Sequence, residues 1–94
     1  MRATELLTIV SVDFQHDAVQ EIKIELKDQV YSICQITKNQ DQLVLVATEV
    51  AQKPIETKSL VTTLMLNKSL QLLKKKETSE MIYGYRIEKN WLIL

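Results

Sequence analysis

Hydrophobic and polar residues alternate along much of this chain, and a period of two predicts β-strands with one solvent-facing side. The clearest case is residues 20–27, where Ile22, Ile24 and Leu26 alternate with charged side chains. We therefore predict a strand here with one buried face. The dipeptide Asp28-Gln29 is expected to form the tight turn that follows, although it lacks the glycine that favours a primed hairpin turn.

Residues 30–37 form the next predicted strand, and the alternation assigns its side chains to two faces. One face is expected to carry Val30, Cys34 and Ile36, and the other Tyr31 and Ile33. Residues 38–41 are polar and predict a loop. Residues 43–50 are apolar on both faces, which is typical of a strand in the middle of a sheet. Three strands with short links predict an antiparallel meander.

Residues 4–14 fit two structures. Leu6, Leu7 and Val10 would share one helical face, with Thr4 as N-cap. The β-branched residues of this segment disfavour a helix and suit a strand. The residues alone favour a strand slightly, with one face made of even-numbered side chains, namely Leu6, Val10, Val12 and Phe14.

The fold depends on residues 54–73. Pro54 fits the first turn of a helix, where its missing N–H is not needed. A continuous apolar face then follows at about 100° per residue. We predict a helix over residues 55–66 that ends near Asn67, a residue that tolerates the left-handed conformation. The residues of its apolar face are Leu60, Val61, Leu64 and Met65.

A strand remains the alternative for this segment, because five leucines of one parity occur between residues 60 and 72. With the helix, the tail from Ser69 to Leu73 is expected to run extended toward three lysines. Residues 77–80 predict a polar loop.

The last part of the chain predicts two more strands. Residues 81–88 alternate, and Gly84, the single glycine, suggests a bulge or a close approach of another backbone. Lys89-Asn90 is expected to be a turn before a short strand from Trp91 to Leu94, paired into the sheet. One face of the first of these strands carries Met81, Tyr83, Tyr85 and Ile87.

Together these elements predict one α+β domain over residues 1–94. We expect an antiparallel sheet of about five strands with one main helix, residues 55–66, packed on one face. The alternative is an all-β meander, which would follow if residues 55–66 were extended.

Composition narrows the function classes. The hydrophobic fraction of 46% is that of a folded globular protein, and 12 basic residues balance 12 acidic ones. A net charge of zero removes the field that would attract nucleic acid or anionic lipid. One cysteine excludes an internal disulfide and predicts a cytoplasmic protein. Charged and polar residues interrupt every apolar run, so we expect neither a signal peptide nor a membrane span.

Candidate chemistry is sparse, and we predict no catalytic, cofactor-binding or metal-binding residue and no enzymatic activity. His16 beside Asp17 could serve as a general base, but a surface-loop histidine is the simpler interpretation. Cys34 in a strand is better explained as a buried structural thiol than as a nucleophile. A single glycine leaves no room for a Gly-rich phosphate loop.

Two features could suggest nucleic acid. The run of three lysines at residues 74–76 could contact phosphates, but acidic residues follow it, and lysines also protect sheet edges. Tyr83 and Tyr85 in one strand could stack on bases, but the basic and Gly-Phe context of an RNA-recognition strand is missing. We interpret these tyrosines as core or dimer-interface residues.

The predicted order is a variable first element, a three-stranded meander, a helix and a two-stranded hairpin. In this order, Leu64-Met65-Leu66-Asn67 forms the end of the helix. Over residues 20–94 the chain resembles the type III secretion chaperones and the related YbjN-like bacterial proteins. The resemblance implies a bacterial, chaperone-like protein in which the first segment is a helix, so residues 4–12 are allowed to be helical.

We therefore expect a non-enzymatic binding module that acts through a sheet edge or an apolar patch, as a homodimer with a protein partner. The alternatives are a small nucleic-acid-binding regulator and a small ligand-binding domain. The residues expected to contact the partner, chosen because aromatics are enriched in interface hot spots, are Tyr31, Ile33, Tyr83, Tyr85 and Trp91.

Overall fold

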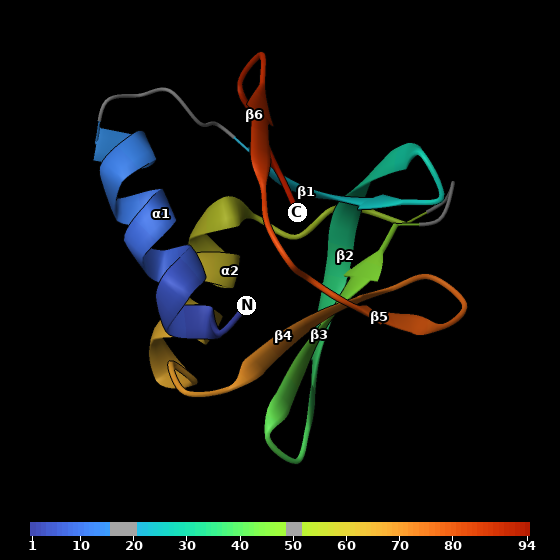
Figure 1. Cartoon of the computed structure of the whole chain (residues 1–94), viewed down its shortest axis with the longest axis horizontal. Helices are drawn as coiled ribbons and strands as arrows, with labels where there is room; N and C mark the ends of the chain where they lie inside the picture. Colours follow the sequence, from blue (N-terminus) through green and yellow to red (C-terminus); the bar gives the residue numbers. More distant parts are fainter. Residues whose placement is uncertain (16–20, 49–51) are drawn as a thin grey trace.

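The computed structural model describes residues 1–15, 21–48 and 52–94, and the α+β class is confirmed. Two helices lie on one side of a single curled sheet (Figure 1). The sheet has seven strands and is mixed, so the prediction of about five antiparallel strands is wrong. The order of the strands is β5-β4-β3-β2-β1-β7-β6. The elements are α1 (Ala3–Gln15), β1 (Glu21–Leu26), β2 (Gln29–Asn39), β3 (Gln42–Ala47), α2 (Thr57–Leu66), β4 (Gln71–Lys75), β5 (Ser79–Met81), β6 (Arg86–Glu88) and β7 (Trp91–Ile93).

The first segment is the helix α1, so the slight preference for a strand is wrong and the helical alternative holds. Ala3, Leu6 and Val10 follow one another at helical spacing and are buried. The first free N–H groups of α1 are bonded, since the amides of Ala3 and Thr4 donate to carbonyls in the turn before β4, at 2.9 Å each. Packing against that turn and the sheet outweighs the low helix propensity of the β-branched residues.

β1 confirms the predicted strand, with Ile22, Ile24 and Leu26 buried. The hairpin to β2 turns at Lys27 and Asp28, one residue earlier than expected. Both residues have positive φ, 50° and 64°, which is the backbone of a primed hairpin turn formed without glycine.

β2 bends at Cys34, where the register with β3 shifts between Ile33 and Gln35. One extra residue reverses the alternation of side chains beyond the bulge. Ile33 and Ile36 therefore both pack toward the core, although the alternation assigned them to opposite faces. Val30, expected on the face of Ile36, is 36% exposed.

The bulge also divides the sheet into two halves. The first part of β2 pairs with β1, and the part from Ile33 onward pairs with β3. β3 lies in the interior of the sheet, as predicted from its two apolar faces, although the structure ends it at Ala47 and residues 49–51 of the expected strand and link lie outside the described residues.

α2 confirms the predicted helix and its end. The helix begins at Thr57, with Glu56 as its N-cap, so the prediction that Pro54 lies in its first turn is wrong. Leu60 and Leu64 are buried against the sheet, whereas Met65 is 57% exposed and so leaves the expected apolar face. Asn67 caps the helix, and its Nδ2 donates to the Thr63 carbonyl at 2.9 Å. After a turn over residues 67–70, the chain becomes extended at Gln71, two residues later than predicted. β4 pairs parallel with β3, so α2 is the crossover between two parallel strands.

The strand predicted over residues 81–88 is two strands in the structure. The first of them, β5, begins at Ser79, so the loop predicted over residues 77–80 is wrong for its last two residues. β5 pairs antiparallel with β4, and β6 pairs antiparallel with β7 at the opposite end of the sheet. Gly84 lies in the connection, with no atom within 4 Å of a Cβ built on it and with no positive φ, so neither the bulge nor the close approach is found. The Lys89-Asn90 turn and the last strand are confirmed, and β7 pairs parallel with β1.

Candidate protein-binding surface

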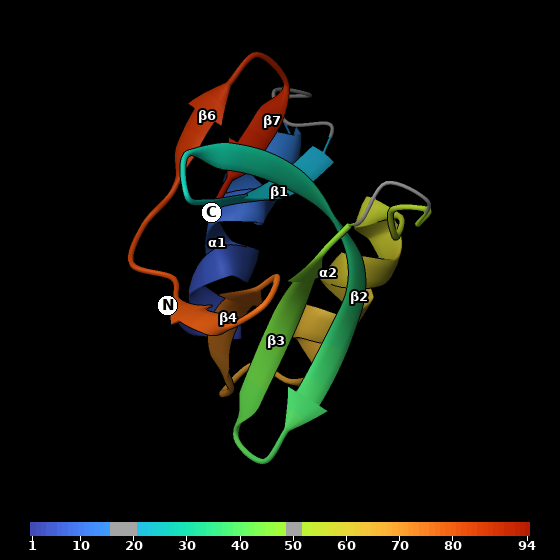
Figure 2. The same ribbon diagram turned by 90° about the vertical axis from the view of Figure 1, so that its right-hand side faces the viewer.

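Residues 82–85, which we call the strap, join the two ends of the sheet. Figure 2 shows this segment as the orange-red trace that runs along one edge of the molecule, from beside the N-terminus to β6. Ile82 is fully buried, and its carbonyl accepts a hydrogen bond from the Met1 amine at 2.8 Å. The strap is therefore anchored at its first residue, and the residues after it are outside.

Large apolar side chains on and beside the strap face solvent. Tyr83 is 89% exposed, Tyr85 is 49% exposed, and Met81, just before the strap, is 40% exposed. Single exposed apolar residues are ordinary, but three within five residues form a contiguous feature. We call Met81, Tyr83 and Tyr85 the strap surface.

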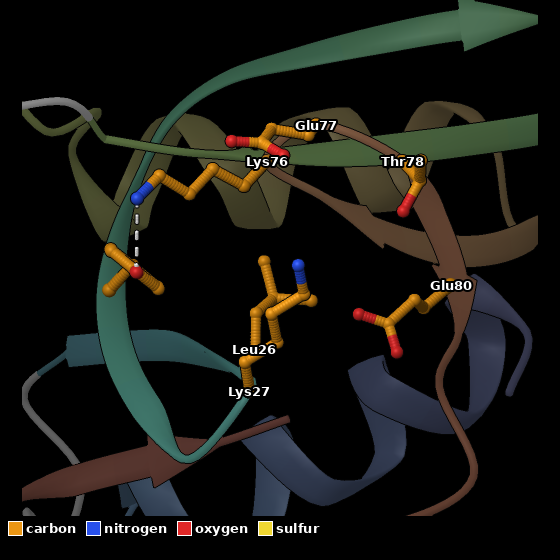
Figure 3. A pocket seen from close by; sticks show the side chains of 7 residues that line it. Leu26, Lys27, Lys76, Glu77, Thr78 and Glu80 are labelled. Atoms are coloured by element: carbon orange, nitrogen blue, oxygen red, sulfur yellow. Dashed lines mark hydrogen bonds between the residues drawn. The ribbon is translucent and has the colours of Figure 1, made fainter.

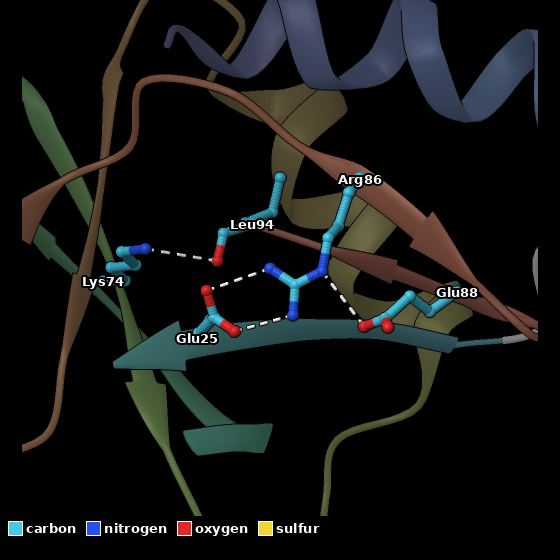
Figure 4. Close-up of polar contacts among 5 residues, drawn as sticks. All are labelled: Glu25, Lys74, Arg86, Glu88 and Leu94. Atoms are coloured by element: carbon cyan, nitrogen blue, oxygen red, sulfur yellow. Dashed lines mark hydrogen bonds and ion pairs between the residues drawn. The ribbon is translucent and has the colours of Figure 1, made fainter. Parts of the chain in front are cut away.

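A cleft of about 320 Å³ lies beside the strap surface and combines apolar walls with charged groups. Four separate parts of the chain contribute to it, namely the strap with the residues on either side of it, β1, β4 and the end of β7. Figure 4 shows the charged groups around Leu94, with Lys74 on one side of it and Arg86, paired with Glu25, on the other. The lining residues are Glu25, Lys74, Met81, Tyr83, Gly84, Tyr85, Arg86, Ile93 and Leu94.

The charged groups of the cleft are held by one another. Arg86 donates to both carboxylate oxygens of Glu25, at 2.9 and 2.6 Å, and its Nε donates to Glu88 at 3.0 Å (Figure 4). The hydrogen bond from Arg86 lowers the pKa of Glu25, and the bonds to Glu25 and then Glu88 raise the pKa of Arg86. Lys74 Nζ donates to the Leu94 carbonyl at 3.3 Å. The arrangement can present a fixed charge pattern beside an apolar surface.

Two of the five expected contact residues, Tyr83 and Tyr85, lie together on the strap surface. Ile33 is only 2% exposed and belongs to the core, so it is not part of this surface. Trp91 is half-buried on β7, where Lys23 Nζ lies 4.7 Å and Lys89 Nζ 5.5 Å from the centroid of its ring. The residues predicted to contact the partner therefore do not form one surface in the structure.

Tyr31 lies at a different, smaller pocket of about 90 Å³ between the β1–β2 turn and the β4–β5 connection (Figure 3). Lys76 Nζ donates to the Tyr31 hydroxyl at 3.1 Å and lies 4.7 Å from its ring centroid. Lys74 instead reaches the Leu94 carbonyl. Two of the three consecutive lysines thus have separate intramolecular contacts rather than one common cationic face.

Cys34 is half-buried, and its Sγ lies 3.5 and 3.4 Å from the carbonyls of Val46 and Ala47 at the bulge. The thiol therefore contacts the backbone of the neighbouring strand, but it is not buried as predicted. His16 and Asp17 lie outside the described residues. Within residues 1–15, 21–48 and 52–94, no group of three metal-ligating side chains is found.

Sequence reasoning missed Glu25, Lys74 and Arg86 as members of the site. Each lies in a strand as an ordinary outward-facing charge, and the three are far apart in the chain. The one signal in the sequence was that Arg86 and Glu25 carry opposite charges. Charge alone cannot predict that two residues 61 positions apart in the sequence form a pair. Met81 was expected on the same strand face as the tyrosines and does join them at the cleft, although not through one strand.

Comparison of this chain with protein families, with curated proteins and with solved structures finds no match. Neither described helix is long and apolar enough to cross a membrane. The fold and the surface are therefore interpreted from their own geometry.

Proposed function

We propose that this protein is a non-enzymatic, chaperone-like binding module that receives an extended apolar segment of a partner protein on the strap surface. The supporting observation is the exposure of Tyr83 and Tyr85 beside a cleft with fixed charges. Aromatic side chains supply large contact areas and are enriched in interface hot spots. The proposal extends to neither nucleic acid nor a small ligand, because no described contact favours them.

The surface is suited to binding without large rearrangement. Ile82 anchors one end of the strap in the core, and the bidentate pair of Arg86 and Glu25 holds the other end against β1. Preorganised side chains lose less conformational entropy when a partner binds. An apolar side chain of the partner would enter the cleft, and its backbone would lie along the two tyrosines.

A random peptide library selected against the protein tests the proposal. We expect the selected peptides to be apolar and to shift the backbone NMR signals of residues 81–87 and of Glu25 and Lys74. The double variant Tyr83→Ser, Tyr85→Ser should lower the affinity for these peptides by at least about tenfold, because both rings are lost.

The matched control is the double variant Met65→Ser, Leu66→Ser, which removes two other exposed apolar side chains from α2. It should bind the peptides as the wild type does. A second, open groove lies between α1 and α2 and is lined by Leu7, Val61 and Met65 among others. Unchanged binding by the tyrosine variant, or NMR shifts confined to this groove, would contradict the proposal. Circular dichroism of both variants checks that they are folded.

A further inference from the structure

Strand β6 ends the sheet, and in the part of the chain that the structure describes it pairs with β7 alone. Its three residues, Arg86, Ile87 and Glu88, are all exposed. The two-residue turn Lys89-Asn90 places Glu88 opposite Trp91. A turn of this length closes on a hydrogen-bonded pair, and such pairs alternate along a hairpin. The N–H and C=O of Ile87 therefore point away from β7, toward the open edge.

We propose that two copies of this protein pair through β6, antiparallel and centred on Ile87. The inference extends the proposed function, because it names a second copy of the chain as one partner. It uses the edge of the sheet, which shares Tyr85 and Arg86 with the cleft. A two-fold axis makes the same strand complementary to itself. Ile87 would exchange two backbone hydrogen bonds with Ile87 of the second copy.

Charge complementarity selects this register. With Ile87 on the axis, Arg86 lies opposite Glu88 of the second copy, and Glu88 lies opposite its Arg86. Within its own chain Arg86 already donates to Glu25 and Glu88, so the pairing between copies adds to this network and does not replace it. Pairing centred on Arg86 would oppose two arginines, and pairing centred on Glu88 would oppose two glutamates, which destabilises cross-strand contacts. If the register between the two strands shifted by one residue, Ile87 of one copy would lie opposite a charged residue of the other.

The side chains that flank the charges also fit. Ile87 is 43% exposed and would meet its own copy across the axis. In the same register Tyr85, 49% exposed, faces Lys89 of the second copy. An ammonium over a tyrosine ring is attractive, and Lys89 already lies near one aromatic ring, that of Trp91.

The other end of the sheet lacks this complementarity. β5 is equally short and equally exposed, but its central residue is Glu80. Antiparallel self-pairing centred on β5 would place Glu80 against Glu80, an unfavourable contact. The two edges of the same sheet thus differ, and only β6 carries opposite charges placed symmetrically about an apolar residue.

Sedimentation measurements over a range of concentrations test the inference through charge reversal. Wild type should dimerise, whereas Arg86→Glu and Glu88→Arg should each raise the dimer dissociation constant by at least about tenfold. An equimolar mixture of the two variants should form a heterodimer, because every cross-strand pair is then again opposite in charge. The control Glu80→Arg reverses a charge on β5 and should dimerise as wild type does.

A backbone variant tests the hydrogen bonds independently. Ile87→Pro removes an N–H that points outward, so it should keep the β6–β7 hairpin and abolish the dimer. Ile87→Thr keeps the N–H and should weaken the dimer less. Circular dichroism and thermal unfolding identify any variant that fails to fold.

A wild type that stays monomeric, or a mixture of folded charge variants that forms no heterodimer, would overturn the inference. The peptide measurements separate this result from the proposed function. A monomer that binds the selected peptides overturns the β6 pairing alone, and a β6-paired dimer that binds none overturns the strap proposal alone.

Discussion

The two halves of the sheet have the same order of strand pairings, but different contacts stabilise their outer faces. Outward from β2, each half contains an antiparallel, then a parallel, then an antiparallel pairing. Both inner faces contribute to one core with the helices, through Leu45 and Leu72 in one half and Ile24 and Leu92 in the other. Topology and inner packing are therefore common to both.

The outer faces differ. In the half formed by β3, β4 and β5, Val44 pairs with Leu73, and both are buried outside the main core. In the half formed by β1, β7 and β6, Lys23 donates to Ser32 at 2.8 Å, and Ser32 donates to Glu21 at 2.8 Å. Ile93, the partner of Lys23 on β7, is also buried outside the main core. The same pattern of strand pairings thus tolerates either apolar burial alone or a polar network around one buried isoleucine on its second face. The surfaces proposed for partners belong to the polar half and the strap.

The largest effects are expected on the shared inner face. Leu72→Ala and Leu92→Ala each remove a fully buried side chain, one in each half. Each should lower the free energy of unfolding by about 2–5 kcal/mol, a large part of the stability of a small domain. Chemical denaturation measures this change. Two separate unfolding transitions would show that the halves do not share one core.

An intermediate effect distinguishes the outer faces. Leu73→Ala should cost about 2 kcal/mol because it leaves a cavity, whereas Lys23→Ala should cost about 1 kcal/mol or less. The loss for Lys23→Ala should shrink in high salt, since screening weakens charge interactions, and that for Leu73→Ala should not. Urea unfolding at two ionic strengths makes the comparison, and equal salt dependence would contradict it.

The smallest effect concerns the pH dependence of the ion pair at β6. Arg86 holds the pKa of Glu25 below its ordinary value of about 4.3. Glu25 therefore contributes stability that is complete above that value and is lost as pH falls through its lower folded-state pKa. The raised pKa of Arg86 adds nothing in this range, because arginine stays protonated.

Thermal unfolding of wild type and Glu25→Gln from about pH 2 to about pH 7 measures this contribution. The midpoint difference should be largest near neutral pH and should close in acid. A difference that stays constant with pH would assign the role of Glu25 to packing rather than to charge.

Local pattern was sufficient where one face of an element is buried. The alternation of Ile22, Ile24 and Leu26 predicted β1, and the spacing of Leu60 and Leu64 with Asn67 behind them predicted α2 and its end. Periodicity identifies such elements because the burial of one face repeats with the geometry of the backbone itself. The exposed tyrosines were named among the contact residues, although without the cleft beside them.

The sequence by itself determined the α+β class, the position of β3 within the sheet, the final turn and strand, and the net charge of zero. Tertiary structure decided that residues 3–15 form a helix and that β2 bends at Cys34. It also decided that residues 79–88 form two strands at opposite ends of the sheet. These outcomes depend on partners distant in the chain, such as the carbonyls before β4 for α1 and the parallel strands β3 and β1. The alternation of apolar and polar residues looks the same in the sequence whether or not a bulge or the strap interrupts the strand. Only contacts between distant parts of the chain could therefore place Ile33 in the core and Tyr83 on the surface.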